Sequence, residues 1–392
     1  FISGIAAGAG IMAAQYWGKQ DAASIEKVIP IALRTNLLFS GLFTILAGFC
    51  PEMLMRIFTN DAALVASGSQ YLRAVALSYV LCGISQVYLI LLKNTGHAAV
   101  SSRISSTAVV LNIILNAILI YGLCGAPALG IRGAAYATVA ARVVELIWAY
   151  LETKKPERVR ILWNRLFSSA GKILSEDFWR YTLPVLAASL VWGIAYVLYS
   201  VIMGHMGSDA VAANSITSIA KSLLSCLIRG VSGGAGVLIG NLLGADELEK
   251  AREYGGRLTH LAIAIGVVTG GLLMLISPAI VHFAPLTDTA AEYLQYMLLF
   301  CGLNLMAQSV NTTVLDGIFC AGGDAKFDMQ GNIGAMWCFS VPLGFLAAFW
   351  LKLPVMVVYC IVNLDEIVKL PAVYLHYKKY VWVRNITRDI EE

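Results

Sequence analysis

The chain alternates long apolar stretches with short polar loops. Each long stretch could cross a bilayer once as a helix, which takes about 20 apolar residues. The two-residue alternation of a membrane β-barrel is absent. The pattern therefore predicts an all-α, polytopic membrane protein. Ten complete spans are expected, with residues 1–15 as the end of another, at 28–50, 69–93, 102–122, 131–151, 178–203, 211–239, 257–283, 291–320, 330–351 and 353–377.

Composition supports burial in lipid. Hydrophobic residues make up 58% of the chain and charged residues 13%, whereas an ordinary soluble domain has roughly 45–50% and about 25%. The net charge of +4 gives no basic footprint for nucleic acid. The eight Cys and five His show no metal-ligand spacing, and no nucleophile and base converge. We therefore expect no metal, no cofactor and no enzymatic activity.

Basic residues predict the orientation in the membrane. Most of the 28 Lys and Arg residues lie in alternate loops, most densely in 152–177, and the opposite loops contain few. Cytoplasmic loops are the ones enriched in Lys and Arg. The basic side, including the tail 378–392, is therefore expected to be cytoplasmic.

The chain contains an internal repeat. Residues 4–18 (GIAAGAGIMAAQYWG) match residues 230–244 (GVSGGAGVLIGNLLG), and Glu145 matches Glu366 at nearly the same offset. Such self-similarity predicts two homologous lobes. An even number of spans in the second lobe makes the repeats parallel, as in some transporters.

The repeat also predicts the domain limits. We expect an N-lobe at 1–151, a cytoplasmic linker at 152–177 containing a short helix on the membrane surface, and a six-helix C-lobe at 178–377. By comparison with the C-lobe, about one and a half spans are expected to be missing before the N-lobe, so that an intact protein would have twelve.

Several motifs, taken in order, resemble those of the multidrug and toxic compound extrusion (MATE) family. They are GAGIMAAQYWGKQD at 8–21, PEMLMRIF at 51–58, VVLNIILNAILIYG at 109–122, LGIRGAAYATV at 129–139, GSDAVAANSI at 207–216 and FCAGGDAK at 319–326. The resemblance implies two six-helix lobes in a V around a central cavity. It also implies export of cationic or amphipathic organic compounds by antiport with H⁺ or Na⁺, through alternating access. Flippases for lipid-linked glycans share the fold and are the alternative.

Family habit further implies a multi-pass protein of the bacterial cytoplasmic (inner) membrane. Its expected partners are a small organic substrate and membrane lipid, without nucleic acid. It is expected to act as a monomer.

Charged side chains inside the spans are the first candidates for a functional site, because each is costly in a bilayer. They are Arg142, Glu145, Lys221, Arg229, Asp316, Asp365, Glu366 and Lys369.

Asp316 is the leading candidate for ion coupling. Residues 308, 312 and 316 lie on one face of an unbroken helix, which places Gln308 beside Asp316. A carboxylate there could exchange a proton, hold Na⁺ or attract a cationic substrate. The alternative is a fixed ion pair with Arg229.

Two acids have basic neighbours three residues away on the same helix: Glu366 has Lys369, and Glu145 has Arg142. Structural or gating ion pairs are therefore favoured for both, with coupling as the alternative. Asp365 has no such obvious partner, and its role is left open.

Polar and aromatic residues complete the candidates. Asn112 and Asn116 share a helix face, and the resemblance implies a place in the first lobe's ion or substrate cavity; interhelical hydrogen bonding is the alternative. Trp192 and Tyr196 also share a face and could stack on a flat cation, or simply pack. Basic residues facing the cavity would instead favour anionic or zwitterionic cargo.

Overall fold

The computed structural model describes residues 1–57, 61–161, 163, 166 and 171–388, and the regular structure in these ranges is helical. The chain divides into two compact units, Phe1–Thr182 and Leu183–Glu392. Eight helical stretches of the described residues are long and apolar enough to cross a membrane. The all-α, multi-span fold class is confirmed.

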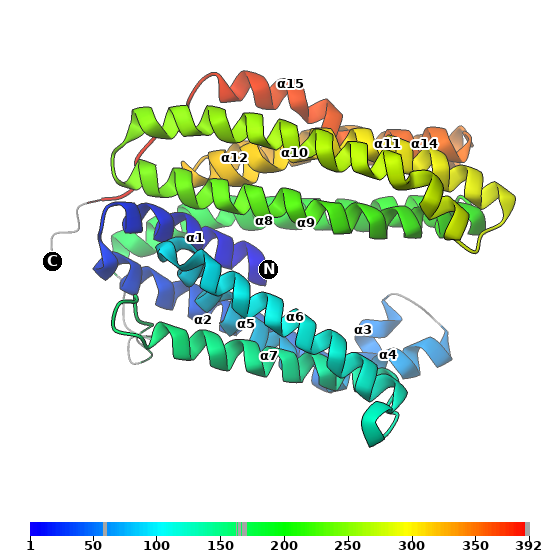
Figure 1. Ribbon diagram of the computed structural model, residues 1–392, viewed down its shortest axis with the longest axis horizontal. Helices are drawn as coiled ribbons and strands as arrows, with labels where there is room; N and C mark the ends of the chain where they lie inside the picture. Colours follow the sequence, from blue (N-terminus) through cyan, green and yellow to red (C-terminus); the bar gives the residue numbers. More distant parts are fainter. Residues whose placement is uncertain (58–60, 162, 164–165, 167–170, 389–392) are drawn as a thin grey trace. The chain divides into compact units, whose positions relative to one another are not determined.

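The first unit is a bundle of long helices joined by short segments. Its helix α6 runs beside α7, and α5 packs against both α2 and α7 (Figure 1). The elements are α1 (Ile2–Gly18), α2 (Ala22–Phe49), α3 (Pro51–Arg56), α4 (Ala62–Val75), α5 (Leu77–Leu92), η1 (Lys93–His97), α6 (Ala98–Tyr121), η2 (Leu123–Gly125) and α7 (Ile131–Thr153).

The second unit is also built of long helices. Helix α8 (Lys172–Gly204) continues into it from the first unit. The other elements are α9 (Ser208–Gly244), α10 (Leu248–Phe283), α11 (Asp288–Thr312), η4 (Thr313–Phe319), α12 (Ala325–Asn332), η5 (Ile333–Ser340), α13 (Val341–Phe345), η6 (Leu346–Trp350), α14 (Val355–Val362) and α15 (Asp365–Tyr377).

Spans 69–93 and 102–122 correspond to separate helices. The first covers the end of α4 and all of α5, the second lies in α6, and α5 and α6 meet at a kink where Gly96 takes a positive φ of 80°. One predicted span is not a single helix. Span 353–377 is broken, because α14 ends at Val362 and α15 begins at Asp365. The surface helix expected in the linker depends on Leu162, Arg165 and Phe167, which lie outside the described residues.

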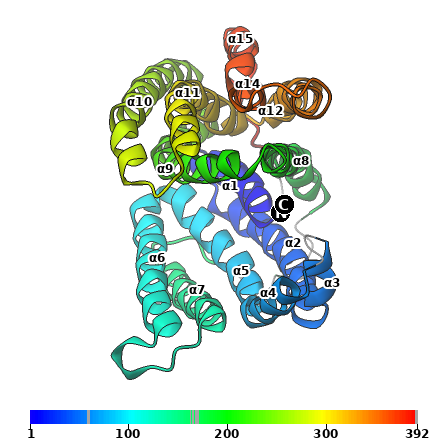
Figure 2. The same ribbon diagram turned by 90° about the vertical axis from the view of Figure 1, so that its right-hand side faces the viewer.

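Close helix contacts in the second unit depend on glycine. Helices α9, α10 and α11 pack against one another (Figure 2). A Cβ on Gly270 of α10 would overlap the backbone oxygen of Gly302 on α11. Only a residue without a side chain lets the two backbones approach this closely. This packing fixes the position of α11, whose polar face forms one side of the site described next.

Candidate functional site

A row of amide side chains runs along one face of α11. Asn304, Gln308 and Asn311 are spaced by four and three residues, and all three are buried. Asn304 Nδ2 donates a hydrogen bond to the backbone oxygen of Asn363 (2.6 Å), and Asn311 Nδ2 donates to that of Glu366 (2.6 Å). Because Asn363 caps the end of α14, Asn304 satisfies a carbonyl at a helix terminus. The α11 amides therefore support both sides of the α14–α15 break.

Three charged side chains form a buried cluster at the start of α15. Lys369 Nζ lies 3.4 Å from Asp365 Oδ2 and 3.3 Å from Glu366 Oε1. Asn311 Nδ2 also donates to Glu366 Oε2 (2.8 Å). The predicted Glu366–Lys369 pair is confirmed. The statement that Asp365 has no obvious local partner is wrong, because a helix also brings residues four apart together.

A cavity of about 310 Å³ opens beside this cluster, within the second unit. Its wall includes Gln308, Asp365 and Glu366, and it also includes the aromatic pair Trp192 and Tyr196. The two rings stack at 5.4 Å with an interplanar angle of 14°. The cavity therefore has an aromatic wall and a charged wall.

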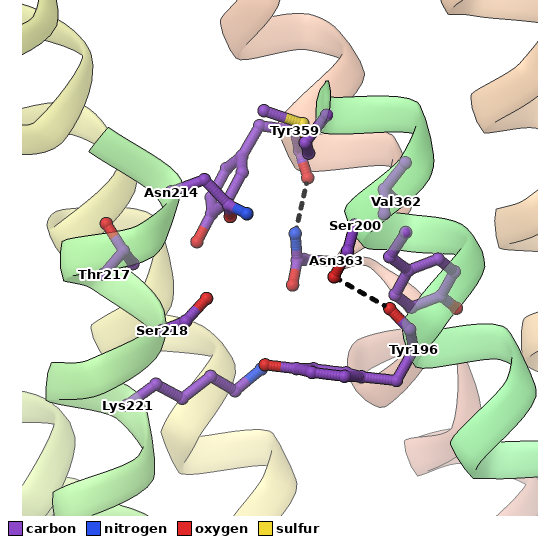
Figure 3. A pocket seen from close by; sticks show the side chains of 11 residues that line it. Tyr196, Ser200, Asn214, Thr217, Ser218, Lys221, Tyr359, Val362 and Asn363 are labelled. Carbon is purple, nitrogen blue, oxygen red and sulfur yellow. Dashed lines mark hydrogen bonds between the residues drawn. The ribbon is translucent and has the colours of Figure 1, made fainter. Parts of the chain in front are cut away.

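Two basic residues from α9 line the same cavity. Lys221 Nζ donates to Asn304 Oδ1 (3.0 Å), and the Arg229 guanidinium lies 5.5 Å from the centre of the Trp192 ring. Lys221 also borders a smaller pocket of about 20 Å³, enough for roughly one water molecule. Figure 3 shows Lys221 and Tyr196 extending toward each other at one side of this pocket, with Asn363 between α8 and α9.

Asp316 does not join Gln308 in the cavity. The prediction assumed an unbroken α-helix, but Thr313–Phe319 forms a π-helical segment, which changes the register of the side chains. Asp316 is exposed and is not among the described residues that line the cavity. It interacts with Arg229 only at longer range, and no ion pair joins the two in the described structure. The expected Asp316–Gln308 grouping is therefore wrong, and so is its alternative, the fixed ion pair with Arg229.

A separate polar group lies in the first unit. Asn116 Nδ2 donates to Asn112 Oδ1 (3.1 Å), and Asn112 Nδ2 donates to Thr138 Oγ1 of α7 (3.4 Å). Asn112 also lines a cavity of about 90 Å³ together with Arg142 and Glu145. Asn112 therefore makes an interhelical contact and also borders a cavity, so neither of the two predicted roles excludes the other, and Asn116 bonds to Asn112 within α6.

An ion pair between Arg142 and Glu145 lies in the wall of this smaller cavity. Arg142 Nη1 lies 2.7 Å from Glu145 Oε2, and Ser85 Oγ donates to Glu145 Oε1 (2.5 Å). The predicted pair is confirmed, and each carboxylate oxygen has a partner. The α15 cluster, with which the predicted repeat pairs it, has one acid more.

A family model named MatE matches residues 1–118 and 184–346. The chain belongs to the MatE family. It is therefore a multi-pass membrane transporter of the MATE type. Among its relatives, the uncharacterized transporter YisQ of Bacillus subtilis is 20% identical over 97% of this chain and 83% of that protein. The probable multidrug resistance protein YoeA of the same organism is 22% identical over 100% and 85%.

Solved structures show the same fold for this MatE transporter. A MOP superfamily transporter from Pyrococcus furiosus, described as having a binding pocket of reverse polarity, has a TM-score of 0.86 at 19% identity. An outward-facing multidrug resistance MATE transporter gives the same two values. Each comparison covers 97% of this chain and 84% of the other.

Three residues in or near the site of this MatE protein were not predicted. Asn304 and Asn363 have no charge and lie 59 positions apart, so only the fold reveals their contact. Asp328 is a buried acid of α12 that interacts electrostatically with Lys369 and accepts a hydrogen bond from Asn332 Nδ2 (3.0 Å). The spacing of Asn304, Gln308 and Asn311 in an apolar span was the available signal for the first of these.

Proposed function

We propose that this protein is a secondary-active exporter of amphipathic organic compounds, driven by H⁺ or Na⁺ moving inward through alternating access. The observation that carries the proposal is the cavity of the second unit, which both the Trp192–Tyr196 stack and the charged start of α15 line. Aromatic faces suit flat organic molecules. A buried, charged cluster in a membrane protein is a natural place for ion exchange.

The coupling step is assigned to Asp365 and Glu366. Two carboxylates contact the ammonium of Lys369, so these three side chains sum to one negative charge when all are ionised. Binding of one H⁺ or Na⁺ would neutralise it. The bound cation changes the attraction that holds the start of α15 to Lys369 and Asn311, and so links ion occupancy to the position of α15.

Other candidate residues have supporting places in this proposal. Gln308 borders both the cavity and Ser225, whose hydroxyl donates to Gln308 Oε1 (3.4 Å). Asn112 and Asn116 would contribute to a second polar site in the first unit. Asp316, exposed outside the cavity, would provide an entry point for the cation or a temporary Na⁺ ligand.

The membrane setting follows the charge distribution. We propose a monomer in the bacterial inner membrane with the basic loops and the C-terminus in the cytoplasm. Beyond the transported compound and the surrounding lipid, the mechanism needs no partner, cofactor or metal other than the coupling ion.

A flippase for a lipid-linked glycan is the second candidate. Lys221 and Arg229 line the cavity and could hold a pyrophosphate. Asp365 and Glu366 line it as well, so the basic residues do not dominate the wall. The antiporter therefore accounts for more of the site.

Reconstitution of the full-length protein into liposomes tests the proposal. The liposomes receive a panel of cationic, zwitterionic and anionic fluorescent dyes, and dye flux is followed after an H⁺ or a Na⁺ gradient is imposed. We expect gradient-driven flux in the wild type and at least a tenfold loss in Glu366→Gln, which removes the charge but keeps the side-chain size. The control is Glu249→Gln, which changes an exposed acid on α10.

Two results would count against the antiporter. One is undiminished gradient-driven flux in Glu366→Gln, which would remove the coupling role of the α15 cluster. The other is the absence of any ion-gradient response combined with translocation of a lipid-linked glycan, which would establish the flippase.

A further inference from the structure

The basic residues around the second-unit cavity differ in whether they form ion pairs. Lys369 is held by two carboxylates. Lys221 instead donates to the neutral Asn304 amide, and Arg229 makes no ion pair with a described residue. Lys221 and Arg229 both line the cavity, and Arg229 is exposed. Two cationic groups are therefore available to a ligand.

The acids of the cavity are less available. Asp365 and Glu366 are buried against Lys369, and Glu366 also accepts from Asn311. A cationic ligand would have to compete with that ammonium for them. Asp316 is exposed but does not line the cavity. The acids that line the cavity are thus already held in ion pairs, whereas neither of its two α9 cations is in an ion pair with a described residue.

The two cations and the aromatic pair are arranged together. Lys221 and Arg229 are eight residues apart, with Ser225 midway, so all three lie along one face of α9, and all three line the cavity. The Arg229 guanidinium lies over Trp192, which stacks on Tyr196. A flat ring against the aromatic stack would carry a substituent directly toward the guanidinium, whose planar shape suits a carboxylate.

We propose that the cargo bound in this cavity is a flat aromatic molecule bearing an anionic group, with Arg229 as the main partner of that group, Lys221 as the second, and the Trp192–Tyr196 stack against the ring. This inference deepens the proposed function and rests on this cavity being the cargo site. It changes the expected cargo from a simple cation to a zwitterion or an anion.

A matched pair of dyes tests the inference. Rhodamine 110 carries a carboxylate on the phenyl ring attached to its flat xanthene, and rhodamine 123 is its methyl ester, which is a cation. Fluorescence anisotropy with purified full-length protein in detergent gives the affinity for each. We expect rhodamine 110 to bind about tenfold more tightly, which corresponds to one charge-assisted hydrogen-bonded contact.

Variants assign the preference to residues. Arg229→Gln should remove the preference and leave the affinity for rhodamine 123 within about twofold, whereas Arg229→Lys should retain part of it. Trp192→Ala should weaken both dyes. Lys250→Gln, which changes an exposed lysine on α10, is the control and should behave like the wild type.

The inference is overturned if rhodamine 123 binds as tightly as rhodamine 110 or more tightly, if neither dye binds, or if Arg229→Gln keeps the preference. Inorganic pyrophosphate is added as a competitor. If it displaces neither dye, the result supports an aromatic carboxylate as cargo over a lipid pyrophosphate. If pyrophosphate binds and rhodamine 110 does not, the inference is overturned. Dye binding needs no ion gradient. Preferential rhodamine 110 binding without gradient-driven flux would therefore refute the antiporter alone, and flux of cationic dyes with equal binding would refute this inference alone.

Discussion

Removing the ammonium of Lys369 should lower the stability of the protein more than removing an exposed lysine ammonium does. In Lys369→Met the side chain keeps much of its length but loses its charge. Lys369, Asp365 and Glu366 are 4%, 7% and 11% exposed, so the two carboxylates would remain in a buried site without a counter-ion. Breaking a buried ion pair in this way costs about 3–5 kcal/mol. For a unit of this size the cost corresponds to a fall in melting temperature of roughly 6–20 °C.

The chain supplies a control of the same sequence spacing. Lys250 and Glu247 are also three residues apart, and their charged atoms lie closer, at 2.8 Å, but they are 61% and 41% exposed. Exposed pairs contribute at most about 1 kcal/mol. Lys250→Met should therefore change the melting temperature by only a few degrees. The comparison separates burial from proximity.

Thermal unfolding in detergent, followed by intrinsic fluorescence, measures both variants. The triple variant Lys369→Met, Asp365→Asn, Glu366→Gln should recover most of the lost stability, because it leaves no unpaired charge. Equal melting temperatures for Lys369→Met and Lys250→Met would refute the reasoning. So would a triple variant that is no more stable than Lys369→Met.

Two further variants test packing and the helix break. Gly270→Ala should destabilise the protein by about 1–3 kcal/mol, because the new Cβ would overlap the Gly302 carbonyl. Its control is Gly41→Ala, which has no atom within 4 Å of the new Cβ and should be neutral or stabilising by up to about 1 kcal/mol. Equal changes in the melting temperatures of the two variants would contradict this. Asn304→Ala should lower the free energy of unfolding by about 1–3 kcal/mol and reduce dye flux, because the Asn363 backbone oxygen loses its donor. Unchanged stability would show that the helix break does not depend on Asn304.

Local sequence spacing predicted the features that depend on a single helix. The Trp192–Tyr196 stack follows from a separation of four, and the Glu366–Lys369 pair from a separation of three. The order of apolar spans gave the fold class. The Asp365–Lys369 pair was accessible by the same rule and was overlooked.

Features that depend on contact between distant segments could not be predicted in this way. The break between Val362 and Asp365 has no Pro or Gly at it, so the apolar run looks like one span. The Asn304 contact with the Asn363 backbone joins residues far apart in the chain. Asp316 was misplaced because the sequence gives no sign of the π-helical turn around it.

Glu145 and Glu366, which the predicted internal repeat pairs, lie in groups of different charge. In the first unit, one Arg faces one Glu on α7; in the second, one Lys faces an Asp and a Glu on α15. The two groups thus differ by one unit of charge, and under the coupling proposed above the additional acid would take up one cation per cycle. Exchange of one inward cation for an outward zwitterion moves one net charge across the membrane. The membrane potential would then add about 2.3 kcal/mol per 100 mV to the driving force, so such a transporter would be electrogenic and would continue to work when the concentration gradient of its coupling ion is small.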